Sequence, residues 1–270
     1  MKLPEIDSKI AKKIIVDFIK EIKNKTNVDG IVIGLSGGID STIVAYLLKE
    51  AIGSENVYSY HLYSSTTPKE DTDHARLIAN LLNISYKELN IDNVFSEFLN
   101  LTNNNSGLEN KVAKGNLNAR IRMSLLYYFA NLNNCLVAGT GNKSELLIGY
   151  FTKYGDGACD FEPIANIYKT QLRKLATSYE IPNEIIDKPP RAGLWEDQTD
   201  EDEIGFSYEV LDQLLYLVND KKLNNEDILH ELSDEDILHE MDISEHDINS
   251  VRRKIDKNQH KSHFPPSPMM

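Results

Sequence analysis

Residue types that can hold a polyphosphate occur together in one run of eight residues, Gly34-Leu35-Ser36-Gly37-Gly38-Ile39-Asp40-Ser41. Glycines allow a sharp turn, and they let backbone N–H groups approach an anion with no Cβ in the way. Ser36 and Ser41 add hydroxyl donors, and the carboxylate of Asp40 can hold a magnesium ion against phosphate oxygens. This run, called the Ser-Gly-Gly loop below, therefore predicts a polyphosphate site.

Two common phosphate-binding patterns do not match the Ser-Gly-Gly loop. A Walker A loop needs Gly-Lys-Ser/Thr after its glycines, and the Rossmann fingerprint needs the spacing G-x-G-x-x-G. The simplest alternative is a tight glycine turn that binds no ligand. Two adjacent glycines alone favour that alternative, but six constrained positions between a strand pattern and a helix pattern favour a phosphate loop.

The residues on either side of the loop predict the elements that position it. An apolar, β-branched run at 30–33 predicts a buried strand, and residues 42–51 predict a helix. A helix is also expected after Asp7, which can cap it. The remaining pattern predicts further strands at 57–63, 84–89 and 135–139, and further helices at 70–82, 92–101, 112–132 and 168–180.

Strands that alternate with helices predict an α/β fold with a doubly wound, mainly parallel sheet and helices on both faces. Ligands of such sheets bind beyond the carboxyl ends of the strands. The Ser-Gly-Gly loop and the segment Thr140-Gly141-Asn142 each come directly after an expected strand. We therefore expect both segments to face the same crevice.

The net charge of −13 is unevenly distributed along the 270 residues. Residues 196–247 carry 19 Asp and Glu against two Lys, whereas the rest carries 27 Lys and Arg against 23 Asp and Glu. No basic stripe stands out, which argues against a nucleic-acid partner and favours a small anionic substrate. No apolar run is long enough to span a bilayer, and residues 1–7 lack an apolar signal segment. These features predict a soluble, cytoplasmic protein with no membrane partner.

The two cysteines give neither a disulfide framework nor metal-ligand spacing. Cys135 heads an apolar run and is expected to be a small buried hydrophobe, and Cys159 lies beside Asp160, whose charge disfavours a thiolate. His230 and His239 recur in a near repeat, residues 226–232 and 235–241, where a solvated amphipathic helix is favoured over a metal site. Residues 101–110 predict a loop, and residues 262–270 predict a flexible tail.

Later motifs identify a family. In their order and spacing they resemble the ammonia-dependent NAD synthetases, which belong to the N-type ATP pyrophosphatases. The resemblance covers nearly the whole chain. The segments that carry it, after the Ser-Gly-Gly loop, lie at 115–123, 139–145, 153–160, 169–172, 188–190, 194–195, 198–201 and 260–261.

The resemblance implies a role for each matching position. It implies an adenine nucleotide α-hydrolase-like fold in one domain, residues 1–270, and a homodimer that binds ATP and deamido-NAD. The Ser-Gly-Gly loop, Thr140 and Lys169 match ATP-binding positions, while Asp40 and Glu145 match magnesium ligands. The positions that match deamido-NAD contacts are Arg120, Lys153, Asp160, His260 and Lys261. Within residues 196–247, we expect a lid around 198–201 and a helical appendage.

One position departs from the family. A Ser or Thr that contacts ATP usually follows the Lys-Pro-Pro-like segment, whereas this chain has Arg191 there. A planar guanidinium cannot replace a hydroxyl without moving. Arg191 either reaches a phosphate or turns into solvent, and it is not assigned to the ATP contacts.

The implied reaction is amidation of deamido-NAD by ammonia, with ATP converted to AMP and pyrophosphate through an acyl-adenylate. Free ammonia is the expected nitrogen donor, because a glutamine-using enzyme needs a second catalytic domain with a cysteine nucleophile. GMP synthetase, asparagine synthetase and tRNA-modifying ligases share a similar loop. GMP synthetase resembles the chain least after residue 110, and a tRNA enzyme should be more basic or carry an extra RNA-binding module. A nucleotide-binding regulator without turnover has no need of paired magnesium carboxylates such as Asp40 and Glu145.

Overall fold

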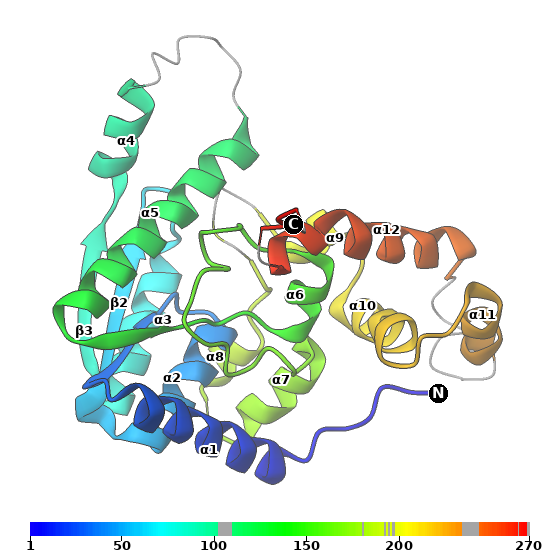
Figure 1. Cartoon of the computed structure of the whole chain (residues 1–270), viewed down its shortest axis with the longest axis horizontal. Coiled ribbons are helices and arrows are strands. Elements are labelled where there is room, and N and C mark those ends of the chain that lie inside the picture. The colour runs from blue at the N-terminus through cyan, green and yellow to red at the C-terminus, as the bar shows by residue number, and fades with distance from the viewer. Residues whose placement is uncertain are drawn as a thin grey trace.

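A computed structural model describes residues 1–101, 110–179, 181–191, 193, 195, 198–233, 243–263 and 265–268. In these residues, parallel strands form one sheet in the order β3-β2-β1-β4 (Figure 1). The strands are β1 (Gly30–Gly34), β2 (Val57–Tyr63), β3 (Ser85–Asn90) and β4 (Cys135–Ala138). Each strand end lies within one residue of its predicted position, so the predicted parallel α/β sheet is confirmed.

The chain reverses its direction of travel across the sheet beside β1. Successive strands β1, β2 and β3 run toward one edge, and β4 then pairs on the other side of β1, with Ile31 opposite Val57 on one side and Leu136 on the other. Such a switch point leaves a crevice at the carboxyl ends of the two strands. The Ser-Gly-Gly loop leaves β1 there, and Thr140 follows β4.

Helices cover both faces of the sheet, as predicted. Ile31 and Ile33 of β1 pack in a core with α1 and α2, whereas Val32 points to the opposite face and packs with residues of α5. The helices are α1 (Ser8–Thr26), α2 (Ile39–Ile52), α3 (Lys69–Leu82), α4 (Asp92–Leu101), α5 (Lys111–Leu132), α6 (Lys143–Ile148), α7 (Lys169–Thr177), α8 (Asn183–Ile186), α9 (Asp200–Ile204), α10 (Tyr208–Leu215), α11 (Asn225–Ser233) and α12 (Glu245–Ser262).

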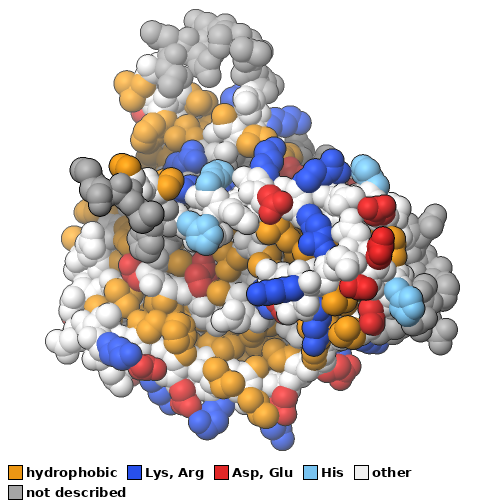
Figure 2. Space-filling model, turned by 45° about the vertical axis from the view of Figure 1, so that its right-hand side comes forward, with side chains coloured by type: hydrophobic (Ala, Val, Ile, Leu, Met, Phe, Trp, Pro, Cys, Tyr) orange, Lys and Arg blue, Asp and Glu red, His pale blue; other side chains and the backbone are white. Residues whose placement is uncertain are grey.

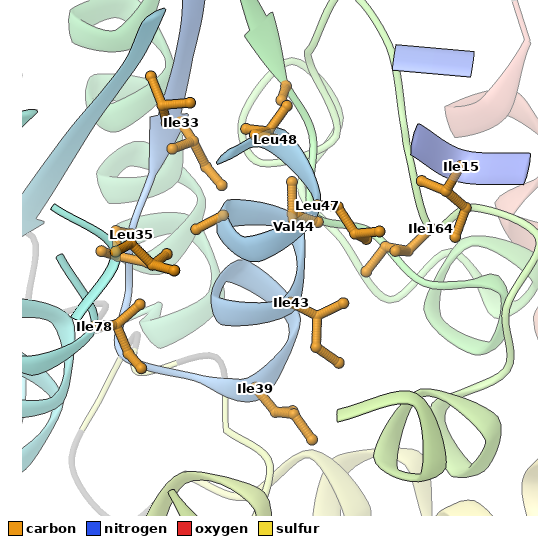
Figure 3. Close-up of a cluster of buried hydrophobic side chains, with 14 of the residues drawn as sticks. Ile15, Ile33, Leu35, Ile39, Ile43, Val44, Leu47, Leu48, Ile78 and Ile164 are labelled. Atoms are coloured by element: carbon orange, nitrogen blue, oxygen red, sulfur yellow. The ribbon is translucent and has the colours of Figure 1, made fainter. Parts of the chain in front are cut away.

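Helix α2 is held firmly in the first core. Its side chains Ile43, Val44, Leu47 and Leu48 are fully buried between the sheet and α1 (Figure 3). Burying an aliphatic side chain of this size contributes about 1.5–3 kcal/mol. The helix begins directly after Gly38, so its free N–H groups point into the loop at a fixed position.

A separate apolar cluster joins the later helices. It contains the buried apolar residues of α10 together with Ile148, Ile228, Ile248 and Val251 from α6, α11 and α12. The amino-terminal residues are tied to the same helices, because the backbone N–H of Leu3 donates to Gln213 Oε1 at 2.8 Å. Gln213 Nε2 in turn donates to the Met1 carbonyl at 2.7 Å.

Other predictions have mixed outcomes. The helix expected at 168–180 spans Lys169–Thr177, and it is followed by α8–α12 rather than closing the pattern. The loop at 101–110 falls almost entirely outside the described residues, as does His239 with the second copy of the repeat. The first copy forms α11, whose Ile228 and Leu232 are buried, as expected of an amphipathic helix. Among the residues expected to form a tail, 265–268 have no regular secondary structure.

Candidate functional site

The Ser-Gly-Gly loop is organised by its own hydroxyl groups. Ser36 Oγ and Ser41 Oγ lie 3.0 Å apart, and each also bonds to the loop backbone, Ser36 Oγ accepting from Gly38 N–H at 3.2 Å. Gly37 has a φ of +82°, and a Cβ there would lie 2.1 Å from the Asp71 carbonyl oxygen. Only glycine fits that position, so the loop's shape is fixed by both conformation and close packing.

A cavity of about 460 Å³ opens in front of the loop. This volume is within the usual range for small-molecule sites. The ATP-binding residues expected from the sequence line it, except Gly37. The lining includes Gly34, Leu35, Ser36, Gly38, Ile39, Asp40, Ser41, Thr140, Glu145, Lys169, Lys188, Arg191, Asp200 and Lys261.

Lys169 links the two carboxylates that the sequence assigned to magnesium. Its Nζ lies 2.5 Å from Asp40 Oδ2 and 3.4 Å from Glu145 Oε1, and its side chain is buried. Asn142 Nδ2 donates to the other carboxylate oxygen of Asp40 at 2.9 Å. Burial alone would lower the pKa of Lys169, but the neighbouring carboxylates outweigh burial and raise the pKa. The lysine is therefore charged.

A third carboxylate, from α9, joins this cluster. Tyr208 O–H lies 3.4 Å from Glu145 Oε1 and 3.3 Å from Asp200 Oδ2, while Tyr150 O–H lies 3.2 Å from Asp200 Oδ1. Burial raises the pKa of Glu145 and the pKa of Asp200. One ammonium thus faces three carboxyl groups, all of which line the cavity.

Asp212 of α10, which sequence reasoning missed, fixes the segment that carries Lys169. Its buried carboxylate accepts from Thr170 N–H at 2.9 Å, from Thr170 Oγ1 at 2.8 Å and from Ser144 Oγ. Ser144 Oγ also accepts from the backbone N–H of Lys169 at 3.0 Å. Asp212 is the one carboxylate within the mainly apolar run 210–218, and this was the available signal, since a buried charge needs partners.

The positions assigned to deamido-NAD divide into two groups. Arg120 Nε and Nη2 each donate to the Lys153 carbonyl at 3.3 Å, and Lys153 Nζ donates to the His260 carbonyl. Lys261 Nζ donates to the carbonyls of Gly149, at 2.6 Å, and Phe151, at 3.0 Å. The structure therefore gathers Arg120, Lys153 and the His260-Lys261 pair around the segment that follows α6.

Asp160 is held separately, beside β4. Its Oδ2 accepts from Val137 N–H at 2.7 Å, and its Oδ1 accepts from Tyr127 O–H at 3.3 Å. Of the five positions assigned to deamido-NAD, Lys261 lines the cavity, whereas Arg120, Lys153, Asp160 and His260 lie outside its lining. Figure 2 shows Lys and Arg side chains gathered over the upper middle of one face of the molecule.

Arg191 lines the cavity, but its guanidinium is paired with two carboxylates. Its Nη2 donates to Glu70 Oε2 at 3.1 Å and to Asp71 Oδ1 at 2.8 Å, both on α3. Lys188 shares the same acceptor atom of Asp71, at 2.7 Å. Sequence reasoning assigned no role to Asp71 or Lys188, because their contact joins segments that are 117 residues apart.

Glu162 stands behind the strand end that leads to Thr140. It accepts from Gly141 N–H at 3.0 Å and from Cys159 Sγ at 3.3 Å. Burial raises the pKa of Glu162 to about 7 and also raises the pKa of the Cys159 thiol. Burial raises the pKa of Cys135 as well, so neither cysteine is poised as a thiolate nucleophile.

The raised pKa of Glu162 predicts a stability that depends on pH. The unfolded chain loses this proton near pH 4.5 and the folded chain near pH 7, so the folded state binds more protons in between. The free energy of unfolding therefore falls as pH rises from about 4.5 to 7. We expect Glu162→Gln to be nearly neutral at pH 4.5 and more stable than the parent chain by up to about 3 kcal/mol at pH 8. Urea unfolding at both pH values measures this difference, and equal differences at both would contradict the assignment.

The fold and the loop together define a class of protein, the α/β proteins with a phosphate-binding loop. A doubly wound α/β sheet carries a glycine-rich loop at a helix N-terminus, on the edge where such sheets bind ligands, and this arrangement suits phosphate groups. The particular family follows from comparison with known sequences. The chain belongs to the NAD synthase family, whose model matches residues 11–265.

Curated relatives from archaea are similar over almost their whole length. A protein of Methanococcoides burtonii named NH(3)-dependent NAD(+) synthetase is 43% identical, and the match covers 94% of this chain and 93% of that protein. A protein of Methanocaldococcus jannaschii with the same name is 44% identical, and the match covers 98% of this chain and 97% of that protein.

Solved structures agree with this family. An NMN synthetase from Francisella tularensis has a TM-score of 0.82 at 31% identity, and the match covers 98% of this chain and 100% of that one. An NH3-dependent NAD synthetase from Campylobacter jejuni, in complex with the nitrate ion, has a TM-score of 0.77 at 34% identity, with the same coverage. The expected family is therefore confirmed.

Proposed function

We propose that this chain catalyses the ATP-dependent amidation of deamido-NAD by ammonia, giving NAD, AMP and pyrophosphate. The observation that carries the proposal is the cluster of Lys169 with Asp40 and Glu145, which lies in the cavity in front of the Ser-Gly-Gly loop. The loop, the Lys169 ammonium and the two carboxylates together suit a nucleotide whose pyrophosphate leaves bound to a cation. The relatives that carry the name of this reaction are similar over nearly the whole chain.

Under this proposal the chemistry needs no protein nucleophile. The nicotinate carboxylate of deamido-NAD attacks the α-phosphorus of ATP, and pyrophosphate leaves to give an acyl-adenylate. Ammonia then attacks the activated carbonyl, and AMP leaves. The loop N–H groups and Lys169 stabilise the charge of the departing pyrophosphate, and Thr140 contacts the nucleotide. Most of the rate enhancement comes from holding two anionic nucleotides in position.

The residues present fit a magnesium ion. The side chains of Asp40 and Glu145 are 20% and 17% exposed, and both line the cavity. Across the described residues, no group of three or more His, Cys, Asp and Glu side chains is placed to hold a metal ion. Magnesium suits two carboxylates, because it commonly completes its shell with water and substrate phosphates. When bound, the ion would neutralise negative charge on the pyrophosphate.

We assign Arg120, Lys153, Asp160, His260 and Lys261 to deamido-NAD. Three cations, Arg120, Lys153 and Lys261, lie together with His260 around residues 149–153, where an anionic dinucleotide would find positive charge. All but Lys261 lie outside the ATP cavity, so the second nucleotide would approach from the side of α5 and α12. Residues 198–201 lie between Lys169 and His260 in sequence, and their action as a lid stays a prediction.

A pyrophosphate-release assay tests the function directly. We expect release with deamido-NAD, Mg²⁺ and ammonium, and at least a hundred-fold less with glutamine in place of ammonium. Neither cysteine has the lowered pKa that a glutaminase nucleophile requires. Acceptors to compare are nicotinate mononucleotide, xanthosine monophosphate and aspartate. Turnover with glutamine, or a clear preference for another acceptor, would contradict the proposal.

We also propose a homodimer formed through α4 and α5. Val94, Phe98 and Leu101 of α4 are exposed at a spacing that places them on one side of the helix. Tyr128 of α5 is exposed as well, although its neighbour Phe129 stacks on Tyr60 in the core. The two helices contact each other, and the end of α4 and the start of α5 project from the body of the molecule (Figure 1). An exposed apolar surface of this kind suits a symmetric contact.

Light scattering checks the dimer. We expect twice the 30.6 kDa mass of the chain at micromolar concentration, because the α4 side chains leave water on association. Phe98→Asp should shift the protein to the single-chain mass. Leu81→Asp, at an exposed apolar side chain of α3, is the matched control and should leave the dimer intact. A parent chain of about 30 kDa would contradict the dimer.

The remaining assignments concern the whole chain. We propose that residues 1–270 act as one NAD synthetase domain in the cytoplasm. In this proposal residues 198–201 act as a lid. Within the acidic segment 196–247, α10 belongs to the apolar cluster of the later helices, and α12 includes Ser262, the first residue of the predicted tail 262–270. Among the described residues, no helix is both long enough and apolar enough to cross a membrane.

A further inference from the structure

Two cations bind the same carboxylate at the edge of the Ser-Gly-Gly loop. Lys188 Nζ and Arg191 Nη2 lie 2.7 Å and 2.8 Å from one atom, Asp71 Oδ1. The Asp71 backbone packs against Gly37, the position in the loop where a Cβ has no room. The pair of cations is therefore next to the segment proposed to hold the ATP phosphates.

Lys188 is fixed in this arrangement. Its side chain is only 7% exposed, and its Nζ also bonds to the Gly37 carbonyl at 2.7 Å and to His74 Nδ1 at 3.2 Å. Three acceptors around one buried ammonium leave it little freedom to move. Lys188 therefore holds the loop against α3, as a positioning residue.

Arg191 is held much less firmly. Its side chain is 26% exposed and lines the cavity, and its second acceptor, Glu70, is 55% exposed. Exposed ion pairs contribute only about 0–1 kcal/mol. In the described part of the chain, Arg191 Nε is buried without a hydrogen-bond partner, so the guanidinium has donor capacity that its present contacts leave unused.

We propose that Arg191 binds the pyrophosphate portion of ATP, leaving Asp71 and Glu70 when the nucleotide enters. This proposal rests on the proposed function. A guanidinium pairs with phosphate oxygens through two parallel hydrogen bonds, and the exchange would satisfy its unused donor. Lys188 stays on Asp71, so the departure of Arg191 leaves no unpaired buried carboxylate. Arg191 thus supplies a charge where a hydroxyl would supply only a dipole.

Binding of inorganic pyrophosphate and of AMP, measured by calorimetry with Mg²⁺, tests the proposal. We expect Arg191→Ala to weaken pyrophosphate binding by about 10- to 100-fold and AMP binding by less than two-fold, because only pyrophosphate meets the guanidinium. The pyrophosphate affinity of Arg191→Lys should lie between those of the parent chain and Arg191→Ala, since lysine keeps the charge but not the paired geometry. Unchanged pyrophosphate affinity in Arg191→Ala would overturn the assignment.

The matched control removes the charge of another arginine, Arg76, which lies on α3. Arg76 pairs with Glu88 through Nε at 2.9 Å and Nη2 at 3.0 Å, and it does not line the cavity. Arg76→Ala should leave pyrophosphate affinity within two-fold of the parent chain. A loss in Arg76→Ala as large as in Arg191→Ala would show a general field effect and overturn direct binding.

A double-mutant comparison tests the exchange of partners. Glu70→Gln removes the negative charge of the exposed acceptor of Arg191, so it should tighten pyrophosphate binding by up to about 5-fold in the parent chain. In the Arg191→Ala background it should have no effect. Equal tightening in both backgrounds would mean that Glu70 repels the anion directly, and would overturn the exchange.

The outcomes separate this inference from the proposed function. A parent chain that amidates deamido-NAD, with pyrophosphate affinity independent of Arg191, overturns the inference alone. A parent chain that binds neither pyrophosphate nor ATP overturns both. Thermal unfolding without ligand should give similar midpoints for the parent chain and Arg191→Lys. Similar midpoints would show that a loss of pyrophosphate affinity in this variant is not caused by misfolding.

Discussion

Replacing Asp40 by Asn should lower the turnover of the proposed amidation by about a hundred- to a thousand-fold while leaving the fold intact. The amide keeps the shape of the side chain but removes the charge that faces both Lys169 and the proposed magnesium ion. Lys169 keeps Glu145 as a partner, so its buried ammonium is not left alone. Pyrophosphate release at saturating Mg²⁺ measures the loss, and thermal unfolding reports the fold.

Glu145→Gln should have an effect of the same order, because it removes the other proposed ligand. Asp17→Asn is the matched control, since Asp17 forms an exposed pair with Lys13 on α1, far in sequence from the site. It should leave turnover unchanged. Near-parental rates in either Asp40→Asn or Glu145→Gln would show that the metal site has been assigned to the wrong residues.

Lys169→Met has the second large expected effect, on stability as well as on activity. Its removal leaves the carboxylates of Asp40, Glu145 and Asp200 close together without their ammonium. Removing one partner of a buried ion pair costs about 3–5 kcal/mol. We expect a loss of that size in the free energy of unfolding, measured with urea at pH 8 without Mg²⁺. Added Mg²⁺ should raise the melting temperature of this variant more than that of the parent chain.

Lys143→Met separates this effect from the loss of any partly buried lysine. Lys143 lies 2.6 Å from Asp220, outside the cavity lining, and one carboxylate rather than three depends on it. It should cost less than Lys169→Met and leave the Mg²⁺ response unchanged. The two variants could instead lose the same free energy of unfolding and show the same rise in melting temperature with Mg²⁺. That result would show that Lys169 does not neutralise the carboxylates of Asp40, Glu145 and Asp200.

The parts of the fold that were predicted well depend on local sequence. Apolar runs such as 30–33 and 135–139 specify buried parallel strands by themselves, and the glycines of the loop specify its turn. The Ser-Gly-Gly loop could be assigned because it lies directly after a strand end, whereas Glu145 was assigned only through the resemblance to the family. In such sheets, strand ends converge on one crevice wherever they occur in the sequence.

The residues that were missed make contacts between distant segments. Asp212 bonds to Ser144 across 68 residues, and Lys188 bonds to Asp71 across 117. Neither contact is encoded by a spacing that can be read along the chain. The partner of Arg191 was also missed, because Asp71 and Glu70 belong to a helix whose amphipathic pattern shows only which side is buried.

The long separation between Asp40 and Lys169 has a consequence for the growing chain. A ribosome completes the Ser-Gly-Gly loop 128 residues before it adds Lys169, and Asp212, which fixes the start of α7, follows later still. Until α10 has emerged, Asp40 lacks the firmly held Lys169 that faces it in the folded chain. Under the proposed function, we therefore expect nucleotide to recognise only molecules whose synthesis has passed α10, and to protect those molecules from unfolding and proteolysis.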